Sequence, residues 1–182
     1  MIRVPAVVAG TLLAAGMLQP LPAGSEDPAS SWQVQAPAPA GEWIAFEGSW
    51  SATGERHTLP TQENRTAAIL RLSGSVVLTA GSGLGRGFRG EAIGYDNGYE
   101  VGLGRWVWTD DRGDRLFGEL KGGPVATGRR TVGIVTGGTG RYAGIRGEYE
   151  FTWQYVVSEG TTMVQGRTTG LKGRFRRAGP SP

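Results

Sequence analysis

The stretch Glu148-Tyr-Glu-Phe-Thr-Trp-Gln-Tyr-Val-Val157 alternates between two kinds of side chain. Its odd-numbered positions are aromatic or apolar, and they are Tyr149, Phe151, Trp153, Tyr155 and Val157. Successive side chains of a β-strand point to opposite faces of a sheet. The alternation therefore predicts a strand with one aromatic face and one mainly polar face.

The same period of two recurs along the chain, whereas no stretch after residue 40 holds the apolar period of a helix. Turn-forming residues separate the alternating runs, and 32 of the 182 residues are Gly. Closing such a sheet removes its exposed edges, so the pattern predicts an all-β fold with a single antiparallel closed barrel of about eight strands. A two-sheet sandwich is the alternative. The predicted strands lie near residues 43–52, 69–78, 88–96, 99–109, 115–120, 129–136, 148–157 and 161–175.

Asn97-Gly98 is the strongest turn signal in the chain. A two-residue type I′ turn there would join the two predicted strands that flank it. Counting outward from that turn places Tyr95 opposite Glu100, and Arg89 opposite Trp106. Each face of the hairpin then holds large apolar groups, so we expect the hairpin to be covered on both sides.

The two ends of the chain differ from its body. Residues 1–23 combine a positive start, an uncharged apolar run and small residues, which is typical of a secretory signal peptide. Residues 24–41 are predicted to be a Pro/Ala/Ser-rich linker, residues 42–176 the β-barrel domain and residues 177–182 a disordered tail. We expect a secreted or periplasmic protein with no stable membrane anchor after signal cleavage, and an uncleaved anchor is the alternative.

The composition excludes several kinds of site. The chain has no Cys and one His, His57, so it cannot form a disulfide, a Cys-ligated metal centre or a multi-histidine site. No metal site and no cofactor are predicted. The formal charge of +3 comes from five basic residues after Glu159, and a terminal cluster on an amphipathic strand does not indicate nucleic-acid binding.

Acidic residues occur in two settings. Asp110-Asp-Arg-Gly-Asp114 could offer carboxylate oxygens to Ca²⁺, but Arg112 occupies a ligand position, and a hairpin turn explains the run without a metal. Glu91 and Glu100 fall within predicted strands, so each is a candidate acid or base if its side chain enters the barrel. The alternative for both is a solvent-facing carboxylate or a cross-strand ion pair.

Residues 135–148 read Val-Thr-Gly-Gly-Thr-Gly-Arg-Tyr-Ala-Gly-Ile-Arg-Gly-Glu and lie between two predicted strands. This segment resembles the strand-turn-strand signature of the allene oxide cyclase-like and dirigent-like barrels. The resemblance implies an eight-stranded barrel, often trimeric, that binds apolar small molecules in its lumen. No cyclase catalytic residue has a match in this sequence. The glycines permit a compact structural loop with Tyr142 and Ile145 turned inward, and the loop residues are Gly137, Gly138, Gly140, Tyr142 and Gly144.

Aromatic side chains are the candidate ligand-binding residues, namely Tyr149, Phe151, Trp153, Tyr155, Trp106 and Trp108. Their polar tips suit an apolar lumen that offers a few hydrogen bonds, and plain core filling is the alternative. We therefore expect a secreted barrel that binds an apolar small molecule. A cyclase or isomerase acting on a hydrophobic substrate, and a non-catalytic structural or oligomerisation module, are the alternative functions. A homo-oligomer is expected as a partner, and the resemblance implies that it is a trimer.

Three observations would separate these functions. A buried, unpaired carboxylate beside Trp153 and Tyr155 would favour the enzyme. A lined lumen without such a carboxylate would favour binding, and a filled lumen with an exposed apolar patch would favour the module.

Overall fold

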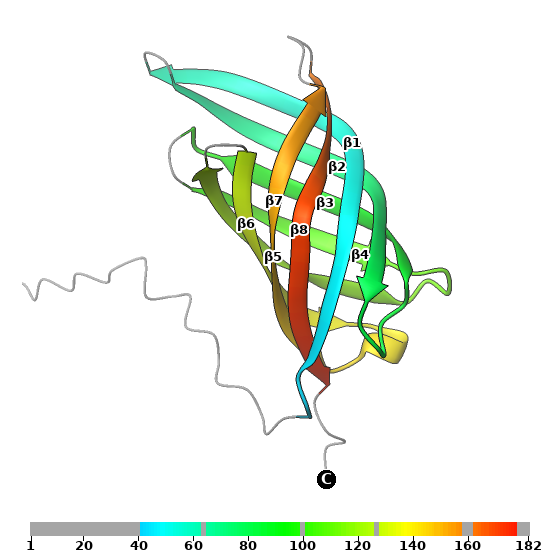
Figure 1. Cartoon of the computed structure of the whole chain (residues 1–182). Helices are drawn as coiled ribbons and strands as arrows, with labels where there is room; N and C mark the ends of the chain where they lie inside the picture. The colour runs from blue at the N-terminus through cyan, green and yellow to red at the C-terminus, as the bar shows by residue number, and fades with distance from the viewer. Residues whose placement is uncertain (1–40, 63–64, 99–100, 126–127, 158–161, 178–182) are drawn as a thin grey trace, which may run out of the picture. The chain divides into compact units, whose positions relative to one another are not determined.

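Eight antiparallel strands close into one barrel in the computed structural model, which describes residues 41–62, 65–98, 101–125, 128–157 and 162–177 (Figure 1). The predicted closed barrel is confirmed, and the two-sheet alternative is excluded, because β1 pairs with β8 as well as with β2. Within these residues, no helix is long and apolar enough to cross a membrane. The strands are β1 (Ile44–Gln62), β2 (Arg65–Ala80), β3 (Gly87–Asp96), β4 (Gly102–Thr109), β5 (Arg115–Val125), β6 (Gly128–Gly138), β7 (Ile145–Val157) and β8 (Met163–Arg177). The predicted signal peptide, most of the predicted linker and residues 178–182 lie outside the described residues.

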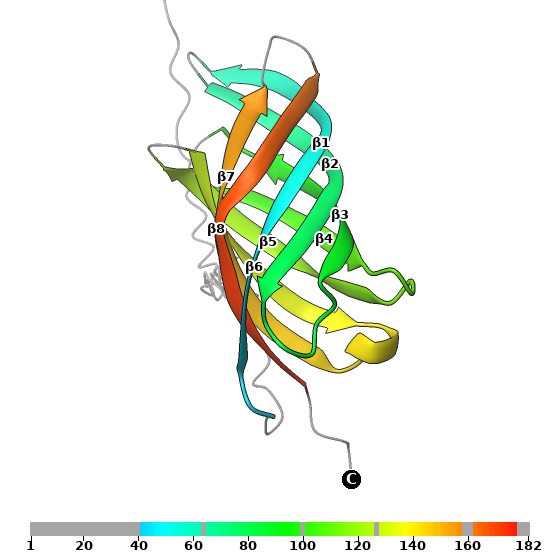
Figure 2. The same cartoon turned by 45° about the vertical axis from the view of Figure 1, so that its right-hand side comes forward.

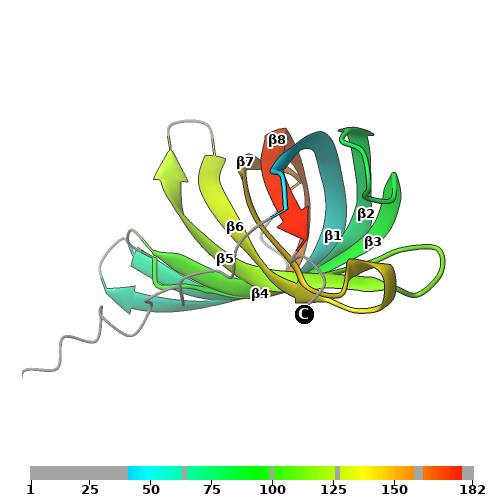
Figure 3. The same cartoon turned by 90° about the horizontal axis from the view of Figure 1, so that it is seen from below.

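The seam between β1 and β8 closes the barrel. Ile44 pairs with Phe175 at one end of the seam, and Glu55 pairs with Met163 at the other. Figures 1 and 2 show the start of β1 and the end of β8 side by side at the lower end, and Figure 3 shows the strands around their common interior. Closure gives each described strand a neighbour on both sides, which removes the edges that invite aggregation.

The first hairpin is longer than its sequence predicts. β1 continues to Gln62 although residues 53–62 show no clear alternation and include Pro60. β2 pairs with it as far as Arg65, and the register is irregular between Pro60 and Gln62, where a proline without an N–H is tolerated. The hairpin, cyan in Figure 1, extends beyond the neighbouring strands. Pairing with β2 therefore extends β1 beyond the residues for which the sequence alternation predicts a strand.

The register of β3 and β4 differs from the prediction. Tyr95 pairs with Leu103, and Arg89 pairs with Thr109, so each partner lies three positions later than a two-residue turn would place it. The predicted register is wrong. Because side chains alternate between faces, a shift by an odd number of residues changes which side chains of the two strands share a face.

The corrected register sorts the hairpin into an apolar inner face and a mixed outer face. Trp106 and Trp108 point into the barrel together with Phe88 and Ala92, and all four are buried. Ile93 is on the outer face and 59% exposed. The expectation that the hairpin is covered on both sides is therefore wrong in the described structure.

A side-chain hydrogen bond accounts for the wider connection between β3 and β4. Residues 97–101 lie between the paired Asp96 and Gly102. The Asp96 carboxylate accepts a hydrogen bond from the Gly98 N–H at 2.9 Å. A carboxylate that binds the backbone two residues further on forms an Asx turn, which starts the reversal at Asp96 rather than at Asn97-Gly98.

Aromatic side chains fill the middle of the barrel. Trp106 and Trp108 have ring centroids 4.8 Å apart, and Trp108 and Tyr149 have centroids 5.2 Å apart. A Cβ at Gly133 would lie 2.1 Å from the Tyr149 ring carbon Cζ, so this neighbour must be glycine. Burial raises the pKa of the Tyr149 phenol well above its usual value, so the ring stays neutral. The aromatic members of the core are Phe46, Trp50, Phe88, Trp106, Trp108, Tyr142, Tyr149, Phe151, Trp153 and Phe175.

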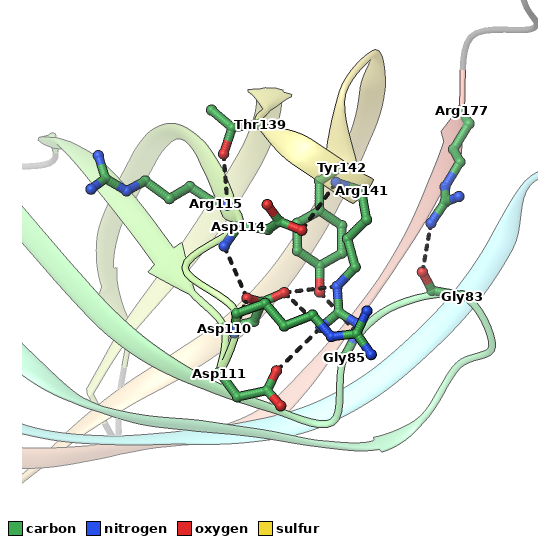
Figure 4. Close-up of polar contacts among 11 residues, drawn as sticks. Gly83, Gly85, Asp110, Asp111, Asp114, Arg115, Thr139, Arg141, Tyr142 and Arg177 are labelled. Carbon is green, nitrogen blue, oxygen red and sulfur yellow. Dashed lines mark hydrogen bonds and ion pairs between the residues drawn. The ribbon is translucent and has the colours of Figure 1, made fainter.

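The lower end of the barrel is closed by the connection between β6 and β7, which includes the 3₁₀ turn η2 (Gly140–Tyr142). Tyr142 and Ile145 are almost completely buried, with 0% and 1% of their surface exposed. The Tyr142 hydroxyl also accepts a hydrogen bond from the Gly85 N–H at 3.2 Å, which ties the turn to the β2–β3 connection (Figure 4). We call this the closed end.

Asp110 joins the β4–β5 turn to the closed end. Its carboxylate accepts the Arg112 and Asp114 N–H groups at 2.8 and 3.0 Å and the Arg141 guanidinium at 2.6 and 2.7 Å (Figure 4). Burial acts to raise the pKa of Asp110, but the hydrogen bonds from Arg112, Tyr142, Arg141 and Asp114 outweigh it and lower that pKa. These donors use the acceptor positions of the carboxylate, so the turn explains the Asp-rich run.

Candidate ligand-binding site

A cavity of about 100 Å³ lies towards the other end of the barrel, away from Tyr142. Residues from β1 to β7 line it, so it is part of the lumen and not a groove on the outer surface. We call this the cavity end. Most of its wall is apolar, and the apolar lining side chains that point inward are Trp50, Leu70, Leu72, Ala92, Leu120, Phe151 and Trp153.

Four glycines on β3, β4 and β5 leave the space for this cavity. Gly94 pairs with Gly104, and Gly102 pairs with Gly122, and all four line the cavity. They lie on the inward row of their strands, where the positions nearer the closed end carry Ala92 and tryptophan side chains. The wall is backbone at these four positions, so a larger residue there would occupy the space.

An ion pair forms the polar side of the cavity. Arg129 Nη1 lies 2.7 Å from Asp96 Oδ2, and their side chains are only 23% and 12% exposed. Asp96 Oδ1 is also used, because it accepts the Gly98 N–H. Both oxygens of this carboxylate therefore have donors, and Asp96 is not the unpaired carboxylate that would favour an enzyme.

Three nitrogen atoms of cavity-lining side chains have no acceptor. Trp50 Nε1, Trp153 Nε1 and Arg129 Nη2 are buried and have no hydrogen-bond partner within the described part of the chain. A buried donor without a partner costs about 1–3 kcal/mol, so such atoms are rare in native proteins. All three unpartnered atoms are donors, but the indole nitrogens lie towards Gly90 and Gly166, which do not line the cavity, so Arg129 Nη2 is the one of the three that belongs to the polar side of the cavity.

Positive charge gathers beside Tyr155 at the mouth of the cavity. Burial raises the pKa of the Tyr155 phenol, while the nearby charges of Arg56 and Arg129 act to lower it and that of Asp96 acts to raise it. The net shift is upward, so the hydroxyl is protonated at neutral pH. Two guanidinium groups and one carboxylate therefore act at this end of the lumen.

The structure divides the predicted ligand-binding residues into two groups. Phe151, Trp153 and Tyr155 line the cavity. Tyr149, Trp106 and Trp108 are packed against one another in the aromatic core nearer the closed end. Core filling accounts for the second group.

Of the two predicted acid or base candidates, the structure describes Glu91 alone. Glu91 lies on the outer face, where its carboxylate accepts a hydrogen bond from Arg89 at 2.8 Å. Glu100 lies outside the described residues. The loop residues predicted to be structural, Gly137, Gly138, Gly140, Tyr142 and Gly144, lie at the closed end.

Sequence reasoning missed three important residues of this site, Trp50, Asp96 and Arg129. The sequence places Asp96 at the end of the predicted strand 88–96 and gives it no role in a site. The alternation Arg129, Thr131, Gly133, Val135 places Arg129 on the inward row of its strand, and this signal could have identified it. Its ion pair with Asp96 could not be found in the same way, because it depends on how β3 and β6 face each other across the lumen.

The described residues contain no group of three or more His, Asp or Glu side chains placed to hold a metal ion. No model of a known protein family matches the chain, and no curated protein matches it in sequence. Its fold is similar to a solved structure described as the pterocarpan synthase dirigent protein GePTS1. The TM-score is 0.44 at 11% identity, over 82% of this chain and 99% of that chain. A likeness of this degree assigns neither a family nor an activity to the chain.

Proposed function

We propose that this protein is an exported, dirigent-like barrel that binds an apolar small molecule at the cavity end of its lumen. The observation that carries the proposal is a cavity with apolar walls inside a barrel whose other end is plugged by Tyr142 and Ile145. Apolar concave sites with a few polar groups are the usual form of small-molecule sites. Export is supported by the composition of residues 1–23.

The size of the cavity limits what it would hold. Sites for larger ligands measure about 300–1,000 Å³, and an apolar cavity of about 150 Å³ is enough for benzene. A volume of about 100 Å³ is smaller than that, so it holds part of one small ring or a short branched chain, and the remaining atoms would lie in the mouth. Large polycyclic molecules would not fit without movement of the walls.

The ion pairs of the described carboxylates favour binding without reaction. Asp96 is the carboxylate that lines the cavity, and it is paired with Arg129. Glu91 and Glu119 are on the outer surface, where they bond to Arg89 and Arg105. The described part of the lumen thus presents no free carboxylate for acid–base chemistry.

Titration with toluene, followed by ligand-observed NMR, tests the proposal. We expect saturable binding to the purified full-length protein. Ala92→Leu adds a side chain to the cavity wall and should abolish binding, whereas Ala80→Leu adds the same side chain at an exposed position and should not. Equal binding by the two variants, or no binding to the unaltered protein, would refute the proposal.

The outer surface favours self-association as a second candidate function. Ile69, Tyr95 and Leu103 follow one another across β2, β3 and β4 in one row of paired residues. They are 60%, 51% and 42% exposed, and Ile93 beside them is also exposed. A contiguous apolar patch of this kind is typical of an interface between proteins.

A further inference from the structure

We infer that the ligand of this cavity is a small apolar carboxylate, whose carboxylate group binds the Arg129 guanidinium and whose apolar part lies against the cavity walls. This inference rests on the proposed binding function and adds the chemical class of the ligand.

The first argument is the kind of hydrogen bond that the cavity lacks. Arg129 lines the cavity, and its Nη2 is a buried donor that has no acceptor within the described residues. A ligand that supplied acceptor oxygens would remove part of this cost, whereas a ligand that offered only donors would add to it. The ligand should therefore carry acceptor atoms.

The second argument is the charge at the mouth. Arg129 Nη1 binds Asp96, whereas Nη2 is buried and has no acceptor within the described residues, so a ligand carboxylate would supply the acceptor that it lacks. Arg56 brings a second positive charge close enough to act on the Tyr155 phenol. Among the described residues that act on Tyr155, two guanidinium groups accompany one carboxylate, and a carboxylate on the ligand would pair with the second guanidinium.

The third argument is the position of the charge relative to the apolar wall. Arg129 pairs with Trp153 on the neighbouring strand β7, so the guanidinium-bearing residue adjoins the aromatic wall. The Trp153 ring packs against the Trp50 ring in a tilted arrangement, with ring centroids 5.1 Å apart. In a molecule with a carboxylate attached to one small ring, the carboxylate would reach Arg129 and the ring would contact the two indoles. An inorganic anion would leave the apolar wall without a contact.

The experiment compares four probes on the full-length protein by equilibrium dialysis and ligand-observed NMR. Benzoate has the ring and the charge, benzamide has the ring and a neutral carbonyl, toluene has the ring alone and acetate has the carboxylate alone. Hydrogen bonds to charged groups contribute about 1.5–3 kcal/mol, which corresponds to about 10- to 100-fold in affinity. We expect benzoate to bind tighter than each of the other three by about that factor.

The outcomes separate this inference from the function on which it rests. If toluene binds and benzoate binds no tighter, the proposed function stands and the inference fails. If benzamide equals benzoate, a neutral acceptor is sufficient, and if acetate equals benzoate, the site takes any anion; either result overturns the inference. If no probe that contains a ring binds, both proposals fail.

A variant tests the role of Arg129 directly. Arg129→Lys keeps a positive charge opposite Asp96 but loses the planar second donor. We expect benzoate affinity to fall about tenfold while toluene affinity is unchanged, and Arg112→Lys at the exposed turn of the closed end should change neither. Unchanged benzoate affinity in Arg129→Lys would contradict the assignment. If that variant does not fold, Arg56→Gln removes the second positive charge that acts near Tyr155, and benzoate should again lose more affinity than toluene.

Discussion

Gly140 shows how a single residue can determine the closed end of the barrel. Its φ is +52°, a conformation that other residues adopt only with strain. A Cβ there would also lie 1.8 Å from Asp114 Oδ1. The Asp114 carboxylate cannot simply move away, because it accepts the Arg141 N–H at 3.1 Å. Glycine is thus required at this position for two separate reasons.

Three alanine substitutions separate these reasons. Gly87→Ala meets no atom within 4 Å and has no positive φ, so its free energy of unfolding should change by less than about 0.5 kcal/mol. In Gly113→Ala the new Cβ also meets no atom, but the backbone has φ +84°, so the free energy of unfolding should fall by about 1–2 kcal/mol. Gly140→Ala should lower the free energy of unfolding by about 1–2 kcal/mol more than Gly113→Ala does, because its new Cβ also clashes with the Asp114 carboxylate and disturbs the hydrogen bond of that carboxylate. Urea denaturation measures all three, and equal losses at Gly113 and Gly140 would contradict the role of Asp114.

At the scale of elements, the register of the β3–β4 hairpin decides which residues face the lumen. The Asx turn at Asp96 places Trp106 opposite Ala92, inside the barrel. Asp96 is also the partner of Arg129 across the lumen, so the same carboxylate shapes the hairpin and forms the polar side of the cavity. A change in this turn would therefore alter the cavity.

Engineered disulfides test this register, since the natural chain has no cysteine. Ile93 pairs with Arg105, and directly opposed residues have Cβ atoms about 4.5–5.5 Å apart, close to the separation that a disulfide requires. The double variant Ile93→Cys/Arg105→Cys should form its disulfide rapidly under mild oxidation. Ile93→Cys/Gly102→Cys, which corresponds to the two-residue turn, should not, because those positions face opposite sides. Thiol titration measures both, and the reverse order would show that the register is wrong.

At the scale of the whole molecule, barrel closure separates an interior for a ligand from an outer surface for other proteins. The interior is largely filled by aromatic rings, and the cavity described above lies at the cavity end. The outer surface carries charged pairs such as Arg130–Glu150 and Arg174–Glu148, together with the apolar row at Ile69, Tyr95 and Leu103. The two proposed roles therefore use different faces of the same strands and can be tested separately.

If the protein self-associates through the apolar row, replacing a residue of the row with lysine should make it dissociate. Ile69→Lys should shift sedimentation towards the monomer mass and leave toluene binding unchanged, because Ile69 points away from the lumen and does not line the cavity. Val77→Lys alters an exposed apolar position away from the row and serves as the control. If the unaltered protein sediments as a monomer at all concentrations, the second candidate function is wrong.

Sequence pattern alone was sufficient for the class of fold and for the direction of many side chains. Alternation along Tyr149, Phe151 and Trp153 predicted an aromatic row, and all three are buried in the barrel. Local alternation is reliable here because neighbouring side chains of one strand must point to opposite sides, whatever that strand pairs with. Each strand therefore carries its own inward row in its sequence.

The positions of these rows relative to one another were decided only by the tertiary structure. Asp96 and Arg129 are far apart in the chain and meet across the lumen, and the hairpin register that brings Trp106 inside depends on a side-chain hydrogen bond in the turn. Turn geometry and partners distant in sequence set the pairing between strands. The alternation within one strand carries no information about either. The sequence by itself therefore determined a barrel with aromatic contents, while the place, size and polar side of its cavity came from how the strands are paired and closed.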